Sequence, residues 1–228
     1  MQQQTNNDMW LVVHVPKTAG TSLRWALEKH LGKAKVIRDY GPHEGMTSEV
    51  VREHLYSGDE SKGPGSLVNA IFRDEIQILI GHFPLQRYAE FFRTQNVITL
   101  VRDPLIRMCS EYLHRVKNKT FTGTFPEFLQ RPAYQNPQSR FLKGVSEATF
   151  IGITEQYSES LQYINSVAHW DLSIRKKNVG RRGGGRKYAE NLSVQELDLF
   201  YKMNSDDVKL YKSATQLFSA FETPEPKT

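Results

Sequence analysis

The stretch WLVVHVPKTAGTS, residues 10–22, joins an apolar run to a turn that contains a lysine, a glycine and three hydroxyl groups. A continuous run of apolar and β-branched residues is typical of a strand buried on both faces of a parallel sheet. When such a turn leads into a helix, backbone N–H groups and the positive end of the helix dipole point at one spot. The stretch therefore predicts an anion-binding corner. The alternative is a plain strand–turn–helix corner with a capping threonine or serine.

The side chains of this turn suit an anion. Lys17 supplies a full positive charge, and Gly20 lets the backbone close around the oxygens of a ligand. Hydroxyl donors come from Thr18, Thr21 and Ser22. In the ATPase motif G-x-x-x-x-G-K-[ST] the lysine follows the second glycine and the next hydroxyl holds Mg²⁺. Because Lys17 precedes Gly20, we do not expect the geometry of an ATP site.

Further apolar runs predict strands of the same sheet over residues 77–81, 96–101 and 149–154. Amphipathic patterns with the helical period lie between them, at 23–30 and 105–116. The alternation predicts an α/β protein: a three-layer, P-loop-like fold with a central, mainly parallel β-sheet flanked by helices. In such folds the ligand lies at the carboxyl ends of the strands.

Two further helices are expected near the C-terminus, over 193–203 and 204–221, the first with a capping box of Ser193 and Glu196. The segments 40–66 and 117–147 are richer in Gly, Pro and polar residues, and we expect them to be excursions over the sheet edge. The prediction is one domain over residues 1–228, with a polar N-terminal tail over 1–8 and a C-terminal tail over 223–228.

A second anion-binding motif follows a second strand, in VITLVRDPLIRMCSEYLHRV at 97–116. The strand ends at Val101, Arg102 follows at its carboxyl end, and Asp103 and Pro104 suit the N-cap and first position of a helix. Ser110 lies almost two turns further on the same face, so one anion could contact both Arg102 and Ser110. The alternative is that Arg102 pairs with a carboxylate and Ser110 is a surface residue.

Composition limits the partners and the compartment. The 228-residue chain has a net charge of +5 and a calculated pI near 9.2, which favours an anionic ligand. Cys109 is the single cysteine, so an intrachain disulfide cannot form. The polar start MQQQTNNDM does not read as a signal peptide or a membrane span. We expect a cytoplasmic protein that binds neither membrane nor nucleic acid.

At this point the sequence resembles a known family. PKTAGTSL at 16–23 and RDPLIRMCSEYLH at 102–114 are similar to the two binding signatures of sulfotransferases that use 3′-phosphoadenosine-5′-phosphosulfate (PAPS). The variant is most similar to the carbohydrate O-sulfotransferases related to the heparan and uronyl enzymes and their small bacterial relatives. The resemblance extends to GHFP at 81–84, to FIGITEQYSESL at 150–161 and to the final helices. It implies a PAPS-dependent transferase whose acceptor is a hydroxyl of a small molecule or a saccharide.

The resemblance also implies which residues hold the nucleotide. In that family the first signature binds the 5′-phosphosulfate, which implies this role for Lys17, Thr18, Ala19, Gly20, Thr21 and Ser22. The second signature binds the 3′-phosphate, which implies this role for Arg102 and Ser110. The loop KKNVGRRGGGRK at 176–187 is similar in character to the Gly-rich basic loop that other sulfotransferases fold over the nucleotide, which implies contacts from Arg181 and Arg182.

Sulfuryl transfer by in-line displacement builds negative charge on the leaving phosphate oxygen. Lys17 at the mouth of the turn can approach that oxygen, and one well-aimed donor in a dry site is typically worth about 3–4 kcal/mol of barrier. His82 follows the apolar run 77–81, and its position matches the catalytic histidine of the family. We therefore expect His82 to be the general base. The alternative is a structural histidine bonded to a backbone carbonyl.

Three other residues are weaker candidates for the base. His14 precedes the turn within a strand, and we expect it to be a buried structural residue. His43 could contact the acceptor. Glu111 is the third candidate. No His, Cys or paired carboxylates have the spacing of metal ligands, so we expect no metal. The other function classes are a P-loop nucleotide kinase or phosphotransferase, which needs Mg²⁺ and a Walker motif, and a basic nucleic-acid-binding protein.

Overall fold

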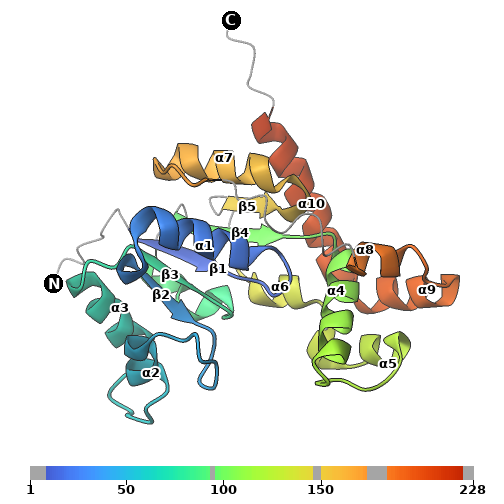
Figure 1. Ribbon diagram of the computed structural model, residues 1–228, viewed down its shortest axis with the longest axis horizontal. Helices are drawn as coiled ribbons and strands as arrows, with labels where there is room; N and C mark the ends of the chain where they lie inside the picture. The colour runs from blue at the N-terminus through green and yellow to red at the C-terminus, as the bar shows by residue number, and fades with distance from the viewer. Residues whose placement is uncertain (1–8, 93–95, 146–149, 174–183, 223–228) are drawn as a thin grey trace, which may run out of the picture.

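Five parallel strands form the central sheet of the computed structural model, which describes residues 9–92, 96–145, 150–173 and 184–222 (Figure 1). The strands are β1 (Trp10–Val13), β2 (Val36–Asp39), β3 (Ile78–Gly81), β4 (Val97–Val101) and β5 (Phe150–Ile153). Their order across the sheet is β2-β3-β1-β4-β5. The predicted strands are confirmed as β1, β3, β4 and β5, and β2 was not predicted.

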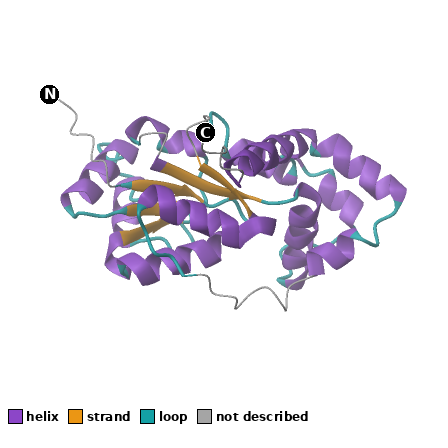
Figure 2. Ribbon diagram, turned by 90° about the horizontal axis from the view of Figure 1, so that it is seen from above, coloured by secondary structure: helices purple, strands orange, loops and turns teal. Residues whose placement is uncertain are grey.

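Ten α-helices are found in the part of the chain that the structure describes. They are α1 (Gly20–Leu31), α2 (Glu49–Leu55), α3 (Pro64–Arg73), α4 (Pro104–Lys117), α5 (Phe125–Leu129), α6 (Pro137–Phe141), α7 (Tyr157–Ala168), α8 (Gly184–Ala189), α9 (Val194–Met203) and α10 (Ser205–Glu222). Figure 2 shows helices on both faces of the sheet, which gives the predicted three-layer α/β arrangement.

Two helix starts follow the predicted capping. Asp103 is the N-cap of α4, and its side chain accepts a hydrogen bond from the backbone N–H of Ile106 at 2.8 Å. Pro104 occupies the first position of the helix, where its missing N–H costs nothing. At α9, Ser193 and Glu196 form the capping box. These caps fix where each helix begins. At α4 the cap, Asp103, directly follows Arg102, the first residue after β4.

The two segments expected to be excursions contain helices. Residues 40–66 hold α2 and the start of α3, and residues 117–147 hold α5 and α6. Each short helix is stabilised by apolar residues that it buries, among them Val51 of α2 and Phe125 of α5. A capping box of Thr124 and Glu127 also starts α5. Prolines and glycines that suggested loops lie at the starts of these helices and between them.

The residues that directly follow the five strands all lie at the carboxyl edge of the parallel sheet. They are His14 after β1, Tyr40 after β2, His82 after β3, Arg102 after β4 and Thr154 after β5. β1 is central, with β3 on one side and β4 on the other. The topology therefore brings the lysine turn, His82 and Arg102 to neighbouring positions.

Two hydrophobic clusters lie on either side of this edge. The larger surrounds the sheet, with strand residues such as Leu11 and Ile80 completely buried. The smaller is built from the helical group α4, α5, α8 and α9, and contains Met108, Cys109, Phe121, Phe125, Phe128, Leu129 and Phe200. The helical group stands beyond the carboxyl edge in Figure 1. None of the described helices has both the length and the apolar character needed to cross a membrane.

Candidate active site

The turn between β1 and α1 has a rare backbone conformation. Lys17 and Ala19 have positive φ angles of 72° and 67°, in the left-handed region that residues with a Cβ avoid. Each such residue costs roughly 1–2 kcal/mol, and outliers of this kind cluster at ligand sites. Two hydrogen bonds hold the turn: the hydroxyl of Thr18 donates to the carbonyl of Val15 at 2.8 Å, and the hydroxyl of Thr154 donates to the carbonyl of Thr18 at 3.0 Å.

The first turn of α1 is open to a ligand. Its N-cap is Ala19, which cannot cap the helix, and no side-chain hydrogen bond to the cap is found within the described residues. The first amides of a helix have no intrahelical partner, so they can bind an anion there. The hydroxyl of Thr18 is used inside the turn, whereas Thr21 is exposed and Ser22 is partly exposed. The two outer hydroxyls are thus the side-chain donors that a ligand can reach.

Residue 20 must be glycine because the His14 ring occupies the space of a side chain there, and not because of its backbone conformation. A Cβ at Gly20 would lie 2.0 Å from Cδ2 of His14, which leaves no room for any side chain. We expected this glycine to let the backbone close around the anion. The packing shows a further reason: the His14 ring fills the space beside the helix start.

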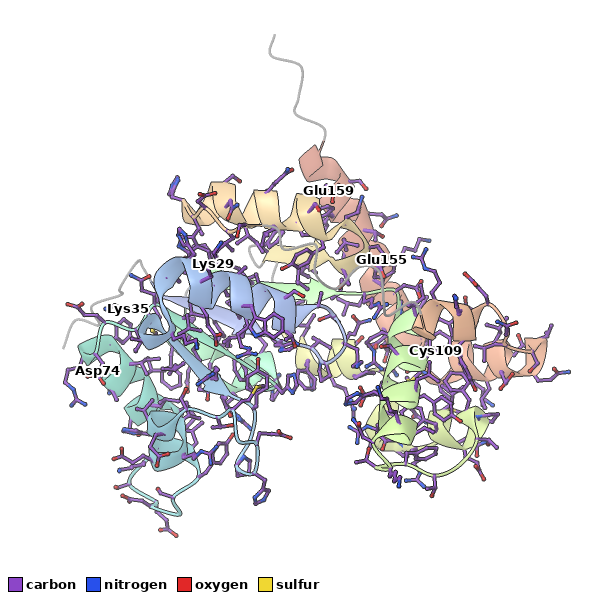
Figure 3. All side chains as sticks on the ribbon, in the orientation of Figure 1. Lys29, Lys35, Asp74, Cys109, Glu155 and Glu159 are labelled. Carbon is purple, nitrogen blue, oxygen red and sulfur yellow. The ribbon has the colours of Figure 1, made fainter. Side chains whose placement is uncertain are left out.

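Arg102 is bound to the lysine turn. Its Nη1 donates a hydrogen bond to the backbone carbonyl of Lys17 at 3.2 Å, and its Nε lies 3.7 Å from Oε1 of Glu155. That second distance is too long for a hydrogen bond, and Nε is buried without a hydrogen-bond partner in the described part of the chain. The two motifs therefore meet at one edge of the sheet. Figure 3 labels Glu155 at the end of β5, on the side that faces the helical group.

The backbone of Arg102 is fixed by a buried glutamine. Gln138 accepts from the N–H of Arg102 at 2.9 Å and donates to its carbonyl at 3.0 Å. Gln138 is itself held by Asp207 of α10, whose carboxylate accepts from the N–H of Gln138 at 3.2 Å and from that of Ser139 at 2.8 Å. Neither Gln138 nor Asp207 was predicted from the sequence. Both residues lie far from Arg102 in the chain, so no short sequence pattern indicates that they contact it or its partner.

Ser110 lies under α8. A Cβ at Gly185 would lie 3.1 Å from both Cβ and N of Ser110, so α8 packs directly on α4 at this residue. The charge of Arg186, also on α8, helps to lower the pKa of Arg102, after the larger effect of burial. Arg186 was not predicted as a site residue. Arg181 and Arg182 lie outside the described residues.

His82 is partly buried beside two other rings. Its backbone N–H donates to the carbonyl of Asp39 at 2.8 Å, and its ring centroid lies 4.5 Å from that of His14 and 4.6 Å from that of Tyr40. Nε2 is buried and has no hydrogen-bond partner among the described residues. Burial lowers the pKa of His82 to about 4, against smaller opposing effects of Glu111 and Asp39. His82 is therefore neutral at pH 7, which is the form that can accept a proton.

A buried carboxylate fixes the neighbouring strand end. Asp39, the last residue of β2, is fully buried and accepts hydrogen bonds from Tyr56 at 2.6 Å, Arg87 at 2.8 Å and Tyr88 at 2.8 Å. Such a complete set of partners is what a buried charge requires. Because the carbonyl of Asp39 holds His82, the network also supports the candidate base.

The remaining candidates differ in their surroundings. His14 is buried, as expected, whereas His43 is exposed in the loop between β2 and α2. Glu111 is buried on α4 and accepts a hydrogen bond from Nε of Arg115 at 2.6 Å. Three residues further on the same helix, burial lowers the pKa of His114 and the charge of Lys17 lowers it further, which indicates that the two side chains lie near one another. His114 was not predicted as a site residue.

Other chemistry has less support in the structure. Burial raises the pKa of the Cys109 thiol to about 12, which is typical of an inert core cysteine (Figure 3). In the described ranges, no three His, Cys, Asp or Glu side chains lie close enough to hold a metal ion. The expectation that the reaction needs no metal stays a prediction.

The chain is similar to known proteins in fold but not in sequence. No protein-family model matches the chain, and no curated protein matches its sequence significantly. Among solved structures, the chain is similar to mouse sulfotransferase SULT7A1 complexed with PAP, with 13% identity and a TM-score of 0.59 over 93% of this chain and 88% of that one. A sulfotransferase from Alicyclobacillus acidocaldarius has 13% identity and a TM-score of 0.45, over 86% of this chain and 95% of that one.

At these identities the comparisons establish the fold alone, and the second TM-score is too low to carry an argument. The closer resemblance to carbohydrate O-sulfotransferases is not tested by this shared fold and stays a prediction. The five-stranded parallel sheet and the helices on its two faces form a three-layer α/β, P-loop-like fold. The mouse sulfotransferase structure shares this fold over 93% of the chain.

Proposed function

We propose that the protein is a sulfotransferase that moves a sulfuryl group from PAPS to an acceptor hydroxyl. The observation that carries the proposal is the hydrogen bond between Arg102 and the backbone of Lys17, beside His82, at the carboxyl edge of a sulfotransferase-like sheet. In that fold class the carboxyl edge is where ligands bind. The mouse neighbour was solved with PAP, the product that PAPS leaves after transfer.

The chain has groups that fit both ends of the donor nucleotide. At the 5′ end are the uncapped amides of α1, the side chain of Lys17 and the hydroxyls of Thr21 and Ser22. At the 3′ end is Arg102, whose buried Nε still lacks a hydrogen-bond partner among the described residues. A guanidinium with an unused donor is suited to a phosphate. Ser110, Arg181 and Arg182 complete the proposed 3′ contacts.

PAPS supplies a sulfuryl group on a leaving group that departs already ionised. We assign Lys17 to stabilise the charge that develops on the bridging oxygen, since a fixed cation in a dry site lowers the barrier most where charge develops. We assign His82 to accept the proton of the acceptor hydroxyl at Nε2, because this nitrogen has no hydrogen-bond partner within the described residues and the ring is unprotonated at pH 7.

The acceptor class rests on the resemblance. We propose a hydroxyl of a saccharide, and we place the exposed His43, in the loop that follows β2, at the acceptor side. A transfer screen with radiolabelled PAPS against saccharides, phenols and small alcohols tests this assignment. Label transferred to a saccharide alone supports it, whereas label transferred only to phenols or small alcohols contradicts the saccharide and leaves the transferase reaction standing.

Calorimetry with adenosine 3′,5′-bisphosphate tests the nucleotide site itself. We expect binding that does not depend on Mg²⁺ and that Lys17→Ala weakens at least tenfold. The matched control is Lys29→Ala, which removes an exposed lysine from the far end of α1 (Figure 3). Tighter binding of ATP with Mg²⁺ would instead support a kinase. Salt-sensitive RNA binding that Lys17→Ala leaves unchanged would support a nucleic-acid-binding protein.

A further inference from the structure

Three aromatic rings from three different strand ends meet at the carboxyl edge. The ring centroids of His14 and His82 are 4.5 Å apart, those of Tyr40 and His82 are 4.6 Å apart, and those of His14 and Tyr40 are 5.8 Å apart. All three pairs pack edge to face, which is a favourable geometry for aromatic rings. The three residues follow β1, β2 and β3, so each ring is mounted on a rigid strand.

His14 is held on the sides that do not face His82. Its Nδ1 is 3.2 Å from the hydroxyl of Tyr40, a buried hydrogen bond across 26 residues of sequence. Its ring occupies the place where a Cβ of Gly20 would be, with Cδ2, Cγ and Nε2 all within 2.4 Å of that position. The His14 ring therefore lies between the anion-binding turn and His82, and it cannot move toward the turn.

The hydrogen bonds of His82 do not explain the orientation of its ring. Its hydrogen bond to the carbonyl of Asp39 uses the backbone N–H, and Nε2 has no partner in the described part of the chain. Catalytic histidines are usually oriented by a hydrogen bond from the second ring nitrogen to a carboxylate or carbonyl. Here the contacts that restrict the ring are the edges and faces of His14 and Tyr40.

We propose that His14 is a positioning residue: its imidazole, fixed by Tyr40 and by the bare Cα of Gly20, fixes the orientation of the His82 ring at the carboxyl edge of the sheet. The inference rests on the proposed function, in which His82 is the base. It assigns to His14 a role for which neither a charge nor a proton is needed, and it explains why the turn has a glycine at residue 20.

The charged neighbours agree with a neutral His14. Burial lowers its pKa well below 6.5, and the nearby His82 and Arg24 of α1 lower it further. His82 faces His14, Tyr40, Asp39 of β2 and Glu111 of α4. Because both imidazoles are neutral at pH 7, His14 does not compete with His82 by carrying a positive charge. The support that it gives is packing in a dry environment.

The test compares His14→Ala with His14→Phe. Phenylalanine keeps an aromatic ring but loses both ring nitrogens, including the Nδ1 that contacts Tyr40. Alanine leaves a space that water can enter. The first readout is the pKa of His82, followed by NMR titration of its ring protons. We expect His14→Ala to move this pKa up toward 6.5, because the ring becomes hydrated, and His14→Phe to leave it low.

The second readout is turnover at saturating PAPS and acceptor. We expect at least a tenfold loss for His14→Ala, with its acid limb moved to higher pH, and less than a threefold loss for His14→Phe. Equal and severe losses in both variants would overturn the proposal, because a ring packed at residue 14 would then not be enough to position His82. An alanine variant with unchanged turnover and unchanged His82 titration would also overturn it.

A further pair of variants guards against misfolding. Gly20→Ala should displace the His14 ring and shift the His82 titration, while Gly45→Ala, whose added methyl group meets no atom within 4 Å, should not. The titration needs no substrate, so it also separates the two hypotheses. If His14→Ala shifts the His82 titration but the wild-type protein transfers no sulfuryl group, the proposed function fails while the contact between the two histidines stands.

Discussion

Arg102 donates a hydrogen bond from Nη1 to the backbone carbonyl of Lys17 at 3.2 Å, across 85 residues of sequence. The bond joins the two anion-binding motifs, because the residue that follows β4 holds the turn that follows β1. Lys17 is one of the residues with a positive φ angle, so the bond also helps to keep the turn in its unusual conformation. A change at Arg102 should therefore affect both ends of a bound nucleotide.

Arg102→Lys should weaken binding of adenosine 3′,5′-bisphosphate at least tenfold. Lysine keeps the charge, but its single ammonium cannot contact the Lys17 carbonyl and a phosphate with the fixed fork of a guanidinium. Calorimetry at one salt concentration measures the effect. Arg73→Lys, on an exposed side chain at the end of α3, is the control and should leave the affinity unchanged. Equal affinities in wild type and Arg102→Lys would remove Arg102 from the site.

His82→Gln should keep nucleotide binding within about twofold and lower turnover by roughly 10²–10⁴, the usual contribution of a general base. The reason is that His82 is proposed to act on the acceptor proton and not on the nucleotide. Calorimetry and a single-turnover transfer assay measure the two properties separately. His30→Gln, at an exposed position on α1, serves as the control. Turnover equal to that of wild type would exclude His82 as the base.

Ala19→Gly should raise the free energy of unfolding by about 0.5–1 kcal/mol. Glycine removes the left-handed strain at φ 67°, although it adds freedom to the unfolded chain. The matched change Ala26→Gly, inside α1, should lower stability by about 1 kcal/mol, because there the helical conformation carries no strain. Urea unfolding measures the free energy of unfolding of both variants. Destabilisation of similar size in both would mean that the turn is relaxed at Ala19.

His14 and His82 should make the protein less stable in mild acid. Their pKa values are lower in the folded protein than the value near 6.5 expected when unfolded, with His82 at about 4. The unfolded chain therefore binds protons first, and stability that is complete above pH 6.5 is lost as pH falls toward 4.

Urea unfolding at pH 7, 5.5 and 4.5 measures this loss. Since carboxylates also titrate in the lower part of this range, the informative quantity is the difference between wild type and His82→Phe. The variant should show a shallower decline between pH 6.5 and 5. Parallel curves for the two proteins would show that His82 does not contribute to the pH dependence.

Much of the sheet could be predicted from sequence because its strands are apolar throughout. β1, β3 and β4 are buried throughout, β5 is buried except for the partly exposed Ile151, and the N-cap of α4 has a local signature in Asp103 and Pro104. β2 was missed because Val36–Asp39 contains two apolar residues followed by Arg38 and Asp39. Its place at the edge of the sheet requires only one strand partner, so a short and partly polar sequence suffices.

The candidate site could be predicted in outline but not in its supporting contacts. Strand ends and helix starts have local patterns, and these located Lys17, His82 and Arg102 at one edge. Glu155 and Gln138 contact Arg102 from residues 53 and 36 positions away, and no short-range pattern encodes such pairs. The His14 ring beside Gly20 is of the same kind, since a glycine in a turn does not reveal which side chain lies beside it.

The buried amide of Gln138 links Arg102 to the beginning of the last helix, since Asp207 fixes the backbone on which that amide is mounted. Asn136 strengthens this link by accepting hydrogen bonds from the N–H groups of Asp206 and Asp207 at 3.1 Å. The final helix is therefore more than a cover for the sheet. Any related chain that replaced it would need another anchor for Arg102, so the two features should be inherited together or lost together.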